Sequence, residues 1–251
     1  MPAIEHPGLS RRAFNLLLAA SLPTPMAFSR SAPKLSARAV VETLFKASAE
    51  EPPKFSHADL SDLDLADLDF KRADLSSCNL FGTDLSRSNL EGSNLSRTKL
   101  DRSTLTRARL SHANLEGASI RRPSIYSDMS LNPADVPTLR FVNLCGATVT
   151  ARLDDADFTG ANLSRARFVV WAERHNGGPP TTGLARCDFS SARMMGVDVR
   201  GVSLTGAIFR QADLTAADLR SADLSYADFE GAVLTGARFE GARLEGAKGL
   251  G

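Results

Sequence analysis

Residues 73–92 read ADLSSCNLFGTDLSRSNLEG, and a leucine stands at every fifth position of this stretch. A small residue stands two positions before each leucine, and Asp or Asn usually stands between the two. A period of five fits neither a helix, near 3.6, nor a strand, at 2. Side chains two positions apart face the same side of an extended segment, so each repeat needs a corner to bring the next pair back to that side. The stretch therefore predicts a coil that buries one small and one large side chain per repeat.

The same spacing extends over most of the chain in three blocks. The first block runs from Leu60 to Ile125. The second begins at Leu139 and slips by one residue between Val149 and Leu153, and the third runs from Leu184 to Leu244. Cys78 and Cys187 stand at the small inward positions, which predicts two buried thiols, and Cys145 stands at an outward one.

The repeats resemble the pentapeptide-repeat family, as in Ala-Asp-Leu-Ser-Ser at 73–77 and Ala-Asp-Leu-Thr-Ala at 212–216. The resemblance covers about residues 56–248 apart from two interruptions. It implies an all-β fold, a right-handed quadrilateral parallel β-helix in which four repeats make one coil. About 34 repeats then give roughly eight coils, or a rod of about 40 Å at the usual strand spacing. Phe189, Phe209 and Phe229 recur every twenty residues, so their rings are expected to stack.

Residues 1–29 are interpreted as a signal peptide. Arg11, Arg12 and Phe14 precede a short apolar run at 16–20, which resembles a bacterial twin-arginine signal. The alternatives are an ordinary secretory signal and an N-terminal tail with a chance Arg-Arg pair. A signal predicts an exported, periplasmic protein, and otherwise the protein is cytoplasmic. The chain has no run of the roughly 18 apolar residues that a membrane span needs.

Residues 30–54 are interpreted as a linker followed by a short amphipathic helix at 36–47. Ser36 is the expected N-cap and Pro52 and Pro53 end the segment. A solenoid exposes an unpaired edge at each end, so this helix is the expected cap of the N-terminal edge. The solenoid itself is expected over residues 55–248. The C-terminal residues 246–251 offer no helix, so the uncovered C-terminal edge of the solenoid is a candidate contact for a homodimer.

Two interruptions of the repeat, at about 121–138 and 169–183, are the expected interaction surfaces. Loops carry function more often than the scaffold that positions them. The alternative is that both are tolerated insertions in a repeat rod. The candidate residues within them, chosen as scarce aromatic, His or charged side chains, are Tyr126, Trp171, Glu173, Arg174 and His175.

Arginines recur at the second position after the large inward residue and are a second candidate surface. They are Arg87, Arg97, Arg102, Arg107 and Arg122. Four repeats per coil would place Arg87 under Arg107 and Arg102 under Arg122. Such a basic strip can bind phosphates or anionic glycans. The alternative is a solvated face with no ligand.

Composition and motifs argue against catalysis. The chain has 30 basic and 29 acidic residues and a formal net charge of +1, so no strong field points to nucleic acid as a partner. No HExxH, P-loop or GxSxG arrangement occurs, and no cofactor or metal is expected.

The sequence therefore predicts a non-catalytic scaffold or interaction protein, exported, whose partner is an unknown protein. Two alternatives stay open. Some members of the family resemble B-form DNA and protect topoisomerase, but that reading needs a strongly acidic, cytoplasmic rod. The other is an exported β-helix that binds or processes polysaccharide, which would need a groove built by the two interruptions.

Overall fold

The computed structural model describes residues 34–48, 50–170 and 182–250, which belong to one unit, Pro33–Gly251. Within this described part of the chain, no helix combines the length and the apolar character needed to cross a membrane. The predictions made for Arg11, Arg12, Phe14, Trp171, Glu173, Arg174 and His175 lie outside the described residues.

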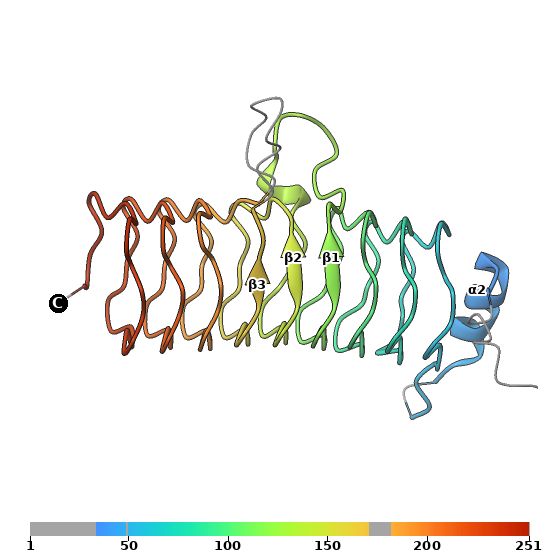
Figure 1. Cartoon of the computed structure of the whole chain (residues 1–251). Coiled ribbons are helices and arrows are strands. Elements are labelled where there is room, and N and C mark those ends of the chain that lie inside the picture. Colours follow the sequence, from blue (N-terminus) through green and yellow to red (C-terminus); the bar gives the residue numbers. More distant parts are fainter. Residues whose placement is uncertain (1–33, 49, 171–181, 251) are drawn as a thin grey trace, which may run out of the picture. The chain divides into compact units, whose positions relative to one another are not determined.

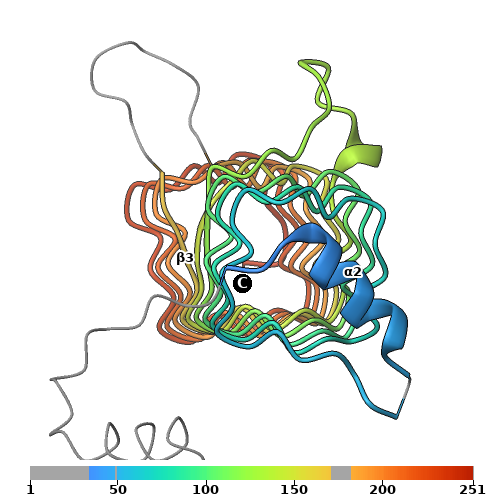
Figure 2. The same ribbon diagram turned by 90° about the vertical axis from the view of Figure 1, so that its right-hand side faces the viewer.

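The repeats form a coil in which each outward residue pairs in parallel with a residue one coil further on. Asp59 pairs with Asn79, and Asn79 with Lys99, so one coil takes 20 residues and four repeats, as predicted. Figure 2 looks along this coil and shows its four-sided outline. We name the faces A to D in the order in which the chain first visits them: Leu60 lies on face A, Leu65 on face B, Phe70 on face C and Leu75 on face D.

The three short β-strands of the described residues lie on face A (Figure 1). They are β1 (Ser119–Arg121), β2 (Thr148–Thr150) and β3 (Arg167–Phe168), which pair in parallel in the order β1-β2-β3. Eight consecutive pairings connect the levels of face A from Asp59 to Arg238, in agreement with the expected eight coils. The right-handed winding implied by the family resemblance stays a prediction.

The large residue of each repeat points into the coil, together with the small residue two positions before it. Leu60, Leu80 and Leu90 have no exposed surface, and both Cys78 and Cys187 are buried as predicted. Burial raises the pKa of Cys78 to about 11. On face C the expected ring stack is present and longer than predicted. Its centroid distances are 5.0, 5.2 and 4.8 Å along the series Phe158, Phe189, Phe209 and Phe229.

The Asp or Asn before each large residue has two structural roles. Its side-chain oxygen accepts the backbone N–H two residues on, as Asn114 does from Glu116 at 3.2 Å. On face D the amides also bond from coil to coil, with Asn143 Nδ2 donating to Asn114 Oδ1 at 2.9 Å and Asn162 to Asn143 at 3.0 Å. These carboxamide ladders explain the pattern without any ligand.

The corners are tight turns whose second residue has a positive φ. At the corner after Leu144, the N–H of Ala147 donates to the Leu144 carbonyl at 2.9 Å, and Gly146 has φ 65°. Arg87, Arg97 and Arg102 occupy the same turn position with φ between 56° and 59°. A type II turn requires this left-handed conformation, which most residues adopt only at a cost.

Gly146 allows the backbone cost of a corner to be measured alone, because an added Cβ would meet no atom within 4 Å. We expect Gly146→Val to lower the free energy of unfolding by about 1–2 kcal/mol, because a branched side chain disfavours positive φ. Gly146→Asn should cost less than about 1 kcal/mol, since Asn tolerates this conformation. Urea unfolding of the two variants followed by circular dichroism checks this. Equal losses would contradict the role assigned to φ.

The two interruptions add residues to a coil without ending it. Asn114 pairs with Asn143, 29 positions on, so the first insertion adds nine residues, and the coil continues through the buried Ile125 before it. Asn143 pairs with Asn162, 19 positions on, which matches the one-residue slip. Arg152 pairs with Gly183, 31 positions on, so the second insertion adds eleven.

Helix α2 (Ala37–Lys46) begins after the predicted N-cap Ser36, whose side chain accepts from Ala39 N. It lies against the first coil (Figure 2), with Val40 and Leu44 buried in the same core as the repeats. Lys71 of the first coil donates from Nζ to the carbonyls of Leu44, at 2.7 Å, and Ala47, at 3.0 Å. These two bonds satisfy carbonyls at the helix C-terminus that have no partner within the helix.

Candidate functional site

Most of the predicted interaction residues that the structure describes border face B, whereas Arg97 follows Leu95 of face D and lies at the corner between faces D and A. Arg87, Arg107 and Tyr126 follow the face B residues Leu85, Leu105 and Ile125, so they lie at the corner between faces B and C. Arg102 and Arg122 lie at the opposite edge, the corner between faces A and B. The structure confirms that Arg87 and Arg107 belong to neighbouring coils, since Arg87 N donates to Thr106 O at 2.9 Å. The arginines therefore lie at three corners and do not form one strip.

Several of these side chains are engaged within the protein. Arg87 makes a bidentate pair with Asp67, at 2.7 and 2.6 Å. The Arg102 guanidinium lies 5.8 Å from the centroid of the Phe81 ring. The Tyr126 hydroxyl donates to the Asp154 carbonyl at 3.3 Å, and burial together with the charge of Asp154 raises the pKa of Tyr126 to about 12. The positive potential along the B–C corner is thus reduced by carboxylates of the same coil stack.

The first insertion is fastened to the coil by Asp135, which ends the short 3-10 helix η2 (Pro133–Asp135). Asp135 is fully buried and accepts from Arg107 Nε at 2.8 Å, from Ser127 N at 2.9 Å and from Ser127 Oγ at 2.5 Å. In addition, Arg107 N donates to the Asp135 carbonyl at 2.7 Å. Arg107 therefore positions the insertion and is not free to bind phosphate with its Nε edge.

This attachment predicts a pH dependence of the insertion. The hydrogen bonds from Ser127, followed by the side-chain hydrogen bond and the charge of Arg107, lower the pKa of Asp135. A lowered carboxyl pKa stabilises the attached form above the ordinary pKa near 4, and this contribution is lost as the pH falls through the lowered value. Hydrogen exchange of residues 126–137, corrected for the intrinsic rate, should therefore become faster below about pH 4.

Asp135→Ala should show the same fast exchange at pH 7. Asp128→Ala is the matched control in the same insertion, because Asp128 is exposed and its side chain accepts hydrogen bonds from Ser130 of the same loop. Equal protection in wild type and Asp135→Ala at pH 7 would contradict this attachment.

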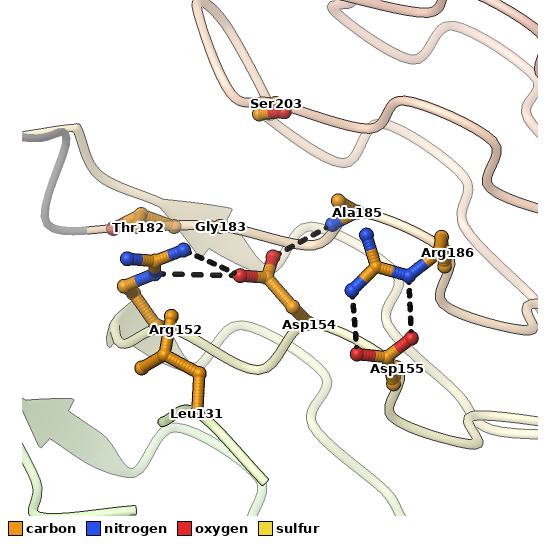
Figure 3. A pocket seen from close by; sticks show the side chains of 9 residues that line it. All are labelled: Leu131, Arg152, Asp154, Asp155, Thr182, Gly183, Ala185, Arg186 and Ser203. Carbon is orange, nitrogen blue, oxygen red and sulfur yellow. Dashed lines mark hydrogen bonds and ion pairs between the residues drawn. The ribbon is translucent and has the colours of Figure 1, made fainter. Parts of the chain in front are cut away.

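A pocket of about 400 Å³ lies on face B next to the first insertion (Figure 3). Its floor is built from small residues of neighbouring coils, and its polar walls are Arg–Asp pairs. The lining residues are Leu131, Arg152, Asp154, Asp155, Thr182, Gly183, Ala185, Arg186 and Ser203. Leu131 comes from the first insertion, and the others come from the coils between the two insertions and just beyond.

Two carboxylates hold the two arginines of the pocket. Asp154 accepts from Arg152 Nε and NH2 at 3.3 and 2.9 Å and from the backbone N–H of Ala185 at 2.9 Å. Asp155 binds Arg186 in a bidentate pair at 2.6 and 2.7 Å. The Asp155–Arg186 pair joins two coils, with a separation of 31 residues that includes the second insertion.

Gly183 leaves space for the Asp154 carboxylate. It stands at the outward position of face B, where Asp64, Asp84 and Asp223 stand in other coils. A Cβ at Gly183 would approach Asp154 Oδ1 to 2.7 Å, well inside contact distance. The space above Gly183 is therefore taken by the Asp154 carboxylate.

The pocket residues were missed when candidates were chosen from the sequence. Two features of the sequence point to them. One is the one-residue slip between Val149 and Leu153, a segment that contains Arg152, and the other is Gly183 at a position usually held by Asp or Asn. Neither feature predicts which side chains pair across an insertion. In the described ranges, no three His, Cys, Asp or Glu side chains gather where a metal ion could be held.

The geometry defines a four-sided parallel solenoid of five-residue repeats, interrupted on both sides of one face. The family model for pentapeptide repeats matches the chain in eight copies, over residues 54–92, 83–122, 138–169, 184–211 and 212–248. The chain belongs to the pentapeptide-repeat family. No curated protein sequence matches it.

Solved structures of the family are similar to the chain. HetL of the cyanobacterium Nostoc sp. strain PCC 7120, described as involved in heterocyst differentiation regulation, is 30% identical, with 75% of each chain covered and a TM-score of 0.43. A trypsin-treated form of QnrB1, a plasmid-mediated fluoroquinolone resistance protein, is 18% identical, with 76% of this chain and 77% of that chain covered and a TM-score of 0.40. A pentapeptide-repeat protein of the Arabidopsis thaliana thylakoid lumen is 16% identical, with 62% and 73% covered and a TM-score of 0.24.

Proposed function

We propose that this protein is a non-catalytic interaction protein whose solenoid presents face B to a partner protein. The observation that carries the proposal is the pocket of about 400 Å³ on face B, beside the first insertion and next to residues that flank the second. Elsewhere along the coil, the outward Asp and Asn side chains bond to their own turns and to neighbouring coils. On face B beside the insertions, Arg152, Gly183 and Ser203 stand at outward positions in neighbouring coils, in place of the Asp or Asn of this pattern.

The proposal is tested with variants that remove each insertion and keep the coil in register. Deleting the nine residues 128–136 leaves Pro137, Thr138 and Leu139 in the phase of a normal repeat after Ile125. Deleting the eleven residues 171–181 leaves Thr182, Gly183 and Leu184 in the phase of a normal repeat after Phe168. The second variant also carries Val170→Gly, because residue 170 then occupies the corner position that requires a positive φ.

Affinity capture with the tagged full chain, from cells that produce it, should recover a partner with wild type. Recovery should fall with either deletion, while the circular dichroism spectrum is kept. Arg97→Ala, at an exposed corner away from face B, is the control and should recover the partner as wild type does. Equal recovery by both deletion variants would contradict the proposal.

We further propose that the protein is exported to the periplasm. The support is the sequence pattern at Arg11, Arg12 and Phe14. Fractionation of cells that carry Arg11→Lys and Arg12→Lys should show the precursor retained in the cytoplasm. Accumulation of the variant in the periplasm would remove the twin-arginine claim.

A contact between two copies through the last coil is also proposed. The core side chains Leu234 and Phe239 are only half-buried there, and Leu244 is 36% exposed, whereas equivalent residues of inner coils are buried. Sedimentation equilibrium of wild type and Phe239→Glu should show a dimer that the substitution dissociates. A monomer in both would overturn this contact.

The topoisomerase alternative predicts that the protein changes supercoiling by DNA gyrase. The proposed function predicts the opposite, because the net charge is close to zero and Arg87 and Arg186 at the B–C corner are paired with Asp67 and Asp155. DNA gyrase should therefore supercoil plasmid DNA at an unchanged rate in the presence of the protein.

A further inference from the structure

The pocket on face B presents arginine donors and keeps their carboxylate partners below them. The side chains of Arg152 and Arg186 are 39% and 63% exposed, whereas those of Asp154 and Asp155 are 11% and 22% exposed. A ligand that enters the pocket therefore meets guanidinium groups first.

Both guanidinium groups keep unused donors. A guanidinium has five N–H donors, and each of these two uses its Nε and NH2 nitrogens on aspartate. No partner among the described residues binds the NH1 nitrogen of Arg152 or Arg186. The aspartates fix the direction of these donors, so little side-chain entropy is lost when a ligand binds them.

We propose that this pocket binds a carboxylate side chain of an acidic segment in the partner protein, an inference that rests on the proposed function. Planar guanidinium edges fit a planar carboxylate with paired hydrogen bonds. The two arginines and two aspartates have no net charge together, so recognition depends on hydrogen-bond geometry more than on attraction of a small anion such as phosphate. Leu131 and Ala185 offer apolar contact for the methylene groups of Glu or of a neighbouring residue.

The lining favours a peptide over an acidic polysaccharide. Sugar rings are commonly held against aromatic side chains, and none of the nine described lining residues is aromatic (Figure 3). Ser203 and Thr182 on the floor are small, which leaves depth for an inserted side chain.

The structure supplies a matched control for the arginine pair. Arg87 and Asp67 make the same bidentate pair at the same B–C corner, with the same distances of 2.6–2.7 Å, and they do not line the pocket. Removing Arg87 or Arg186 breaks the same kind of pair and should have a different effect on binding, and the stability of each variant is measured beside it because Asp67 is 60% exposed and Asp155 22%.

The test measures fluorescence anisotropy of labelled hexaglutamate with the full chain. We expect hexaglutamate to bind wild type, hexaglutamine not to bind, and Arg152→Met or Arg186→Met to weaken binding about tenfold. Arg186→Lys keeps the charge but lacks the planar guanidinium donors, so it should also weaken binding. Arg87→Met should bind hexaglutamate as wild type does. Thermal melts of Arg186→Met and Arg87→Met establish that both are folded to the same extent.

Four outcomes would overturn the inference. They are no binding of hexaglutamate to wild type, unchanged affinity in Arg152→Met and Arg186→Met, tighter binding of polygalacturonate than of hexaglutamate, and competition by inorganic phosphate at equal affinity, which would show a general anion site. Each of these results leaves the affinity-capture test of the proposed function standing. Conversely, if both deletion variants still captured the partner as wild type does, the proposed function would be overturned, even where hexaglutamate binds through Arg186.

Discussion

Leu90→Asp is expected to abolish cooperative folding of the solenoid. Leu90 is fully buried on face C, between the levels of Phe70 and Leu110, and its backbone N–H donates to Arg109 O in the next coil at 2.9 Å. A carboxylate at this position would lie in an apolar interior without a partner, which costs more than about 5 kcal/mol unless the coil opens. Because each coil is stabilised only by its neighbours, opening one coil separates the stacks on either side.

Urea unfolding followed by circular dichroism measures this effect. The control is Arg97→Asp, which places the same residue at an exposed corner and should change the unfolding free energy by less than about 1 kcal/mol. An unchanged unfolding curve for Leu90→Asp would mean that the central residue of the repeat does not point inward.

Phe209→Ala is expected to produce the second largest loss. Phe209 lies in the middle of the face C stack, 5.2 Å from the Phe189 ring and 4.8 Å from the Phe229 ring. The substitution removes both ring contacts and leaves a cavity, at a cost of about 3–5 kcal/mol. The free energy of unfolding from urea denaturation checks this value.

Phe209→Leu is the matched comparison, since Leu90 and Leu110 occupy the same position of face C in other coils. It should cost less than about 1.5 kcal/mol, because a large apolar side chain is retained. Equal losses for the Ala and Leu variants would show that neither the rings nor the volume they fill support this part of the coil.

The repeat made much of the fold predictable. The period of five at Leu75, Leu80 and Leu85 requires a corner in every repeat, and burial of these residues follows from that geometry alone. Four repeats per coil came from the family resemblance, and the pairing of Asp59 with Asn79 confirms it. The spacing of Phe189, Phe209 and Phe229 predicted their stack, but Phe158 was missed because an insertion changes its spacing to 31 residues.

The candidate site was less predictable for a physical reason. Inside a regular block, a residue meets the residue twenty positions away, so Asp67 and Arg87 could be paired by counting. Asp155 and Arg186 make the same pair across the second insertion, and only the structure shows that this insertion returns the chain to register. Arg107 was predicted to offer its charge to a ligand, yet Asp135 of the first insertion folds back onto it.

Site-specific crosslinking tests the central claim, that face B is the surface that binds a partner. A benzophenone side chain is placed at Ser203 on the pocket floor in one variant and at Arg97 in another, and each is irradiated in cells that produce the protein. We predict a crosslinked partner from Ser203 alone, attached through a segment rich in Asp or Glu that mass spectrometry identifies. Crosslinking of the same partner from Arg97 with equal yield, or none from Ser203, would contradict the account.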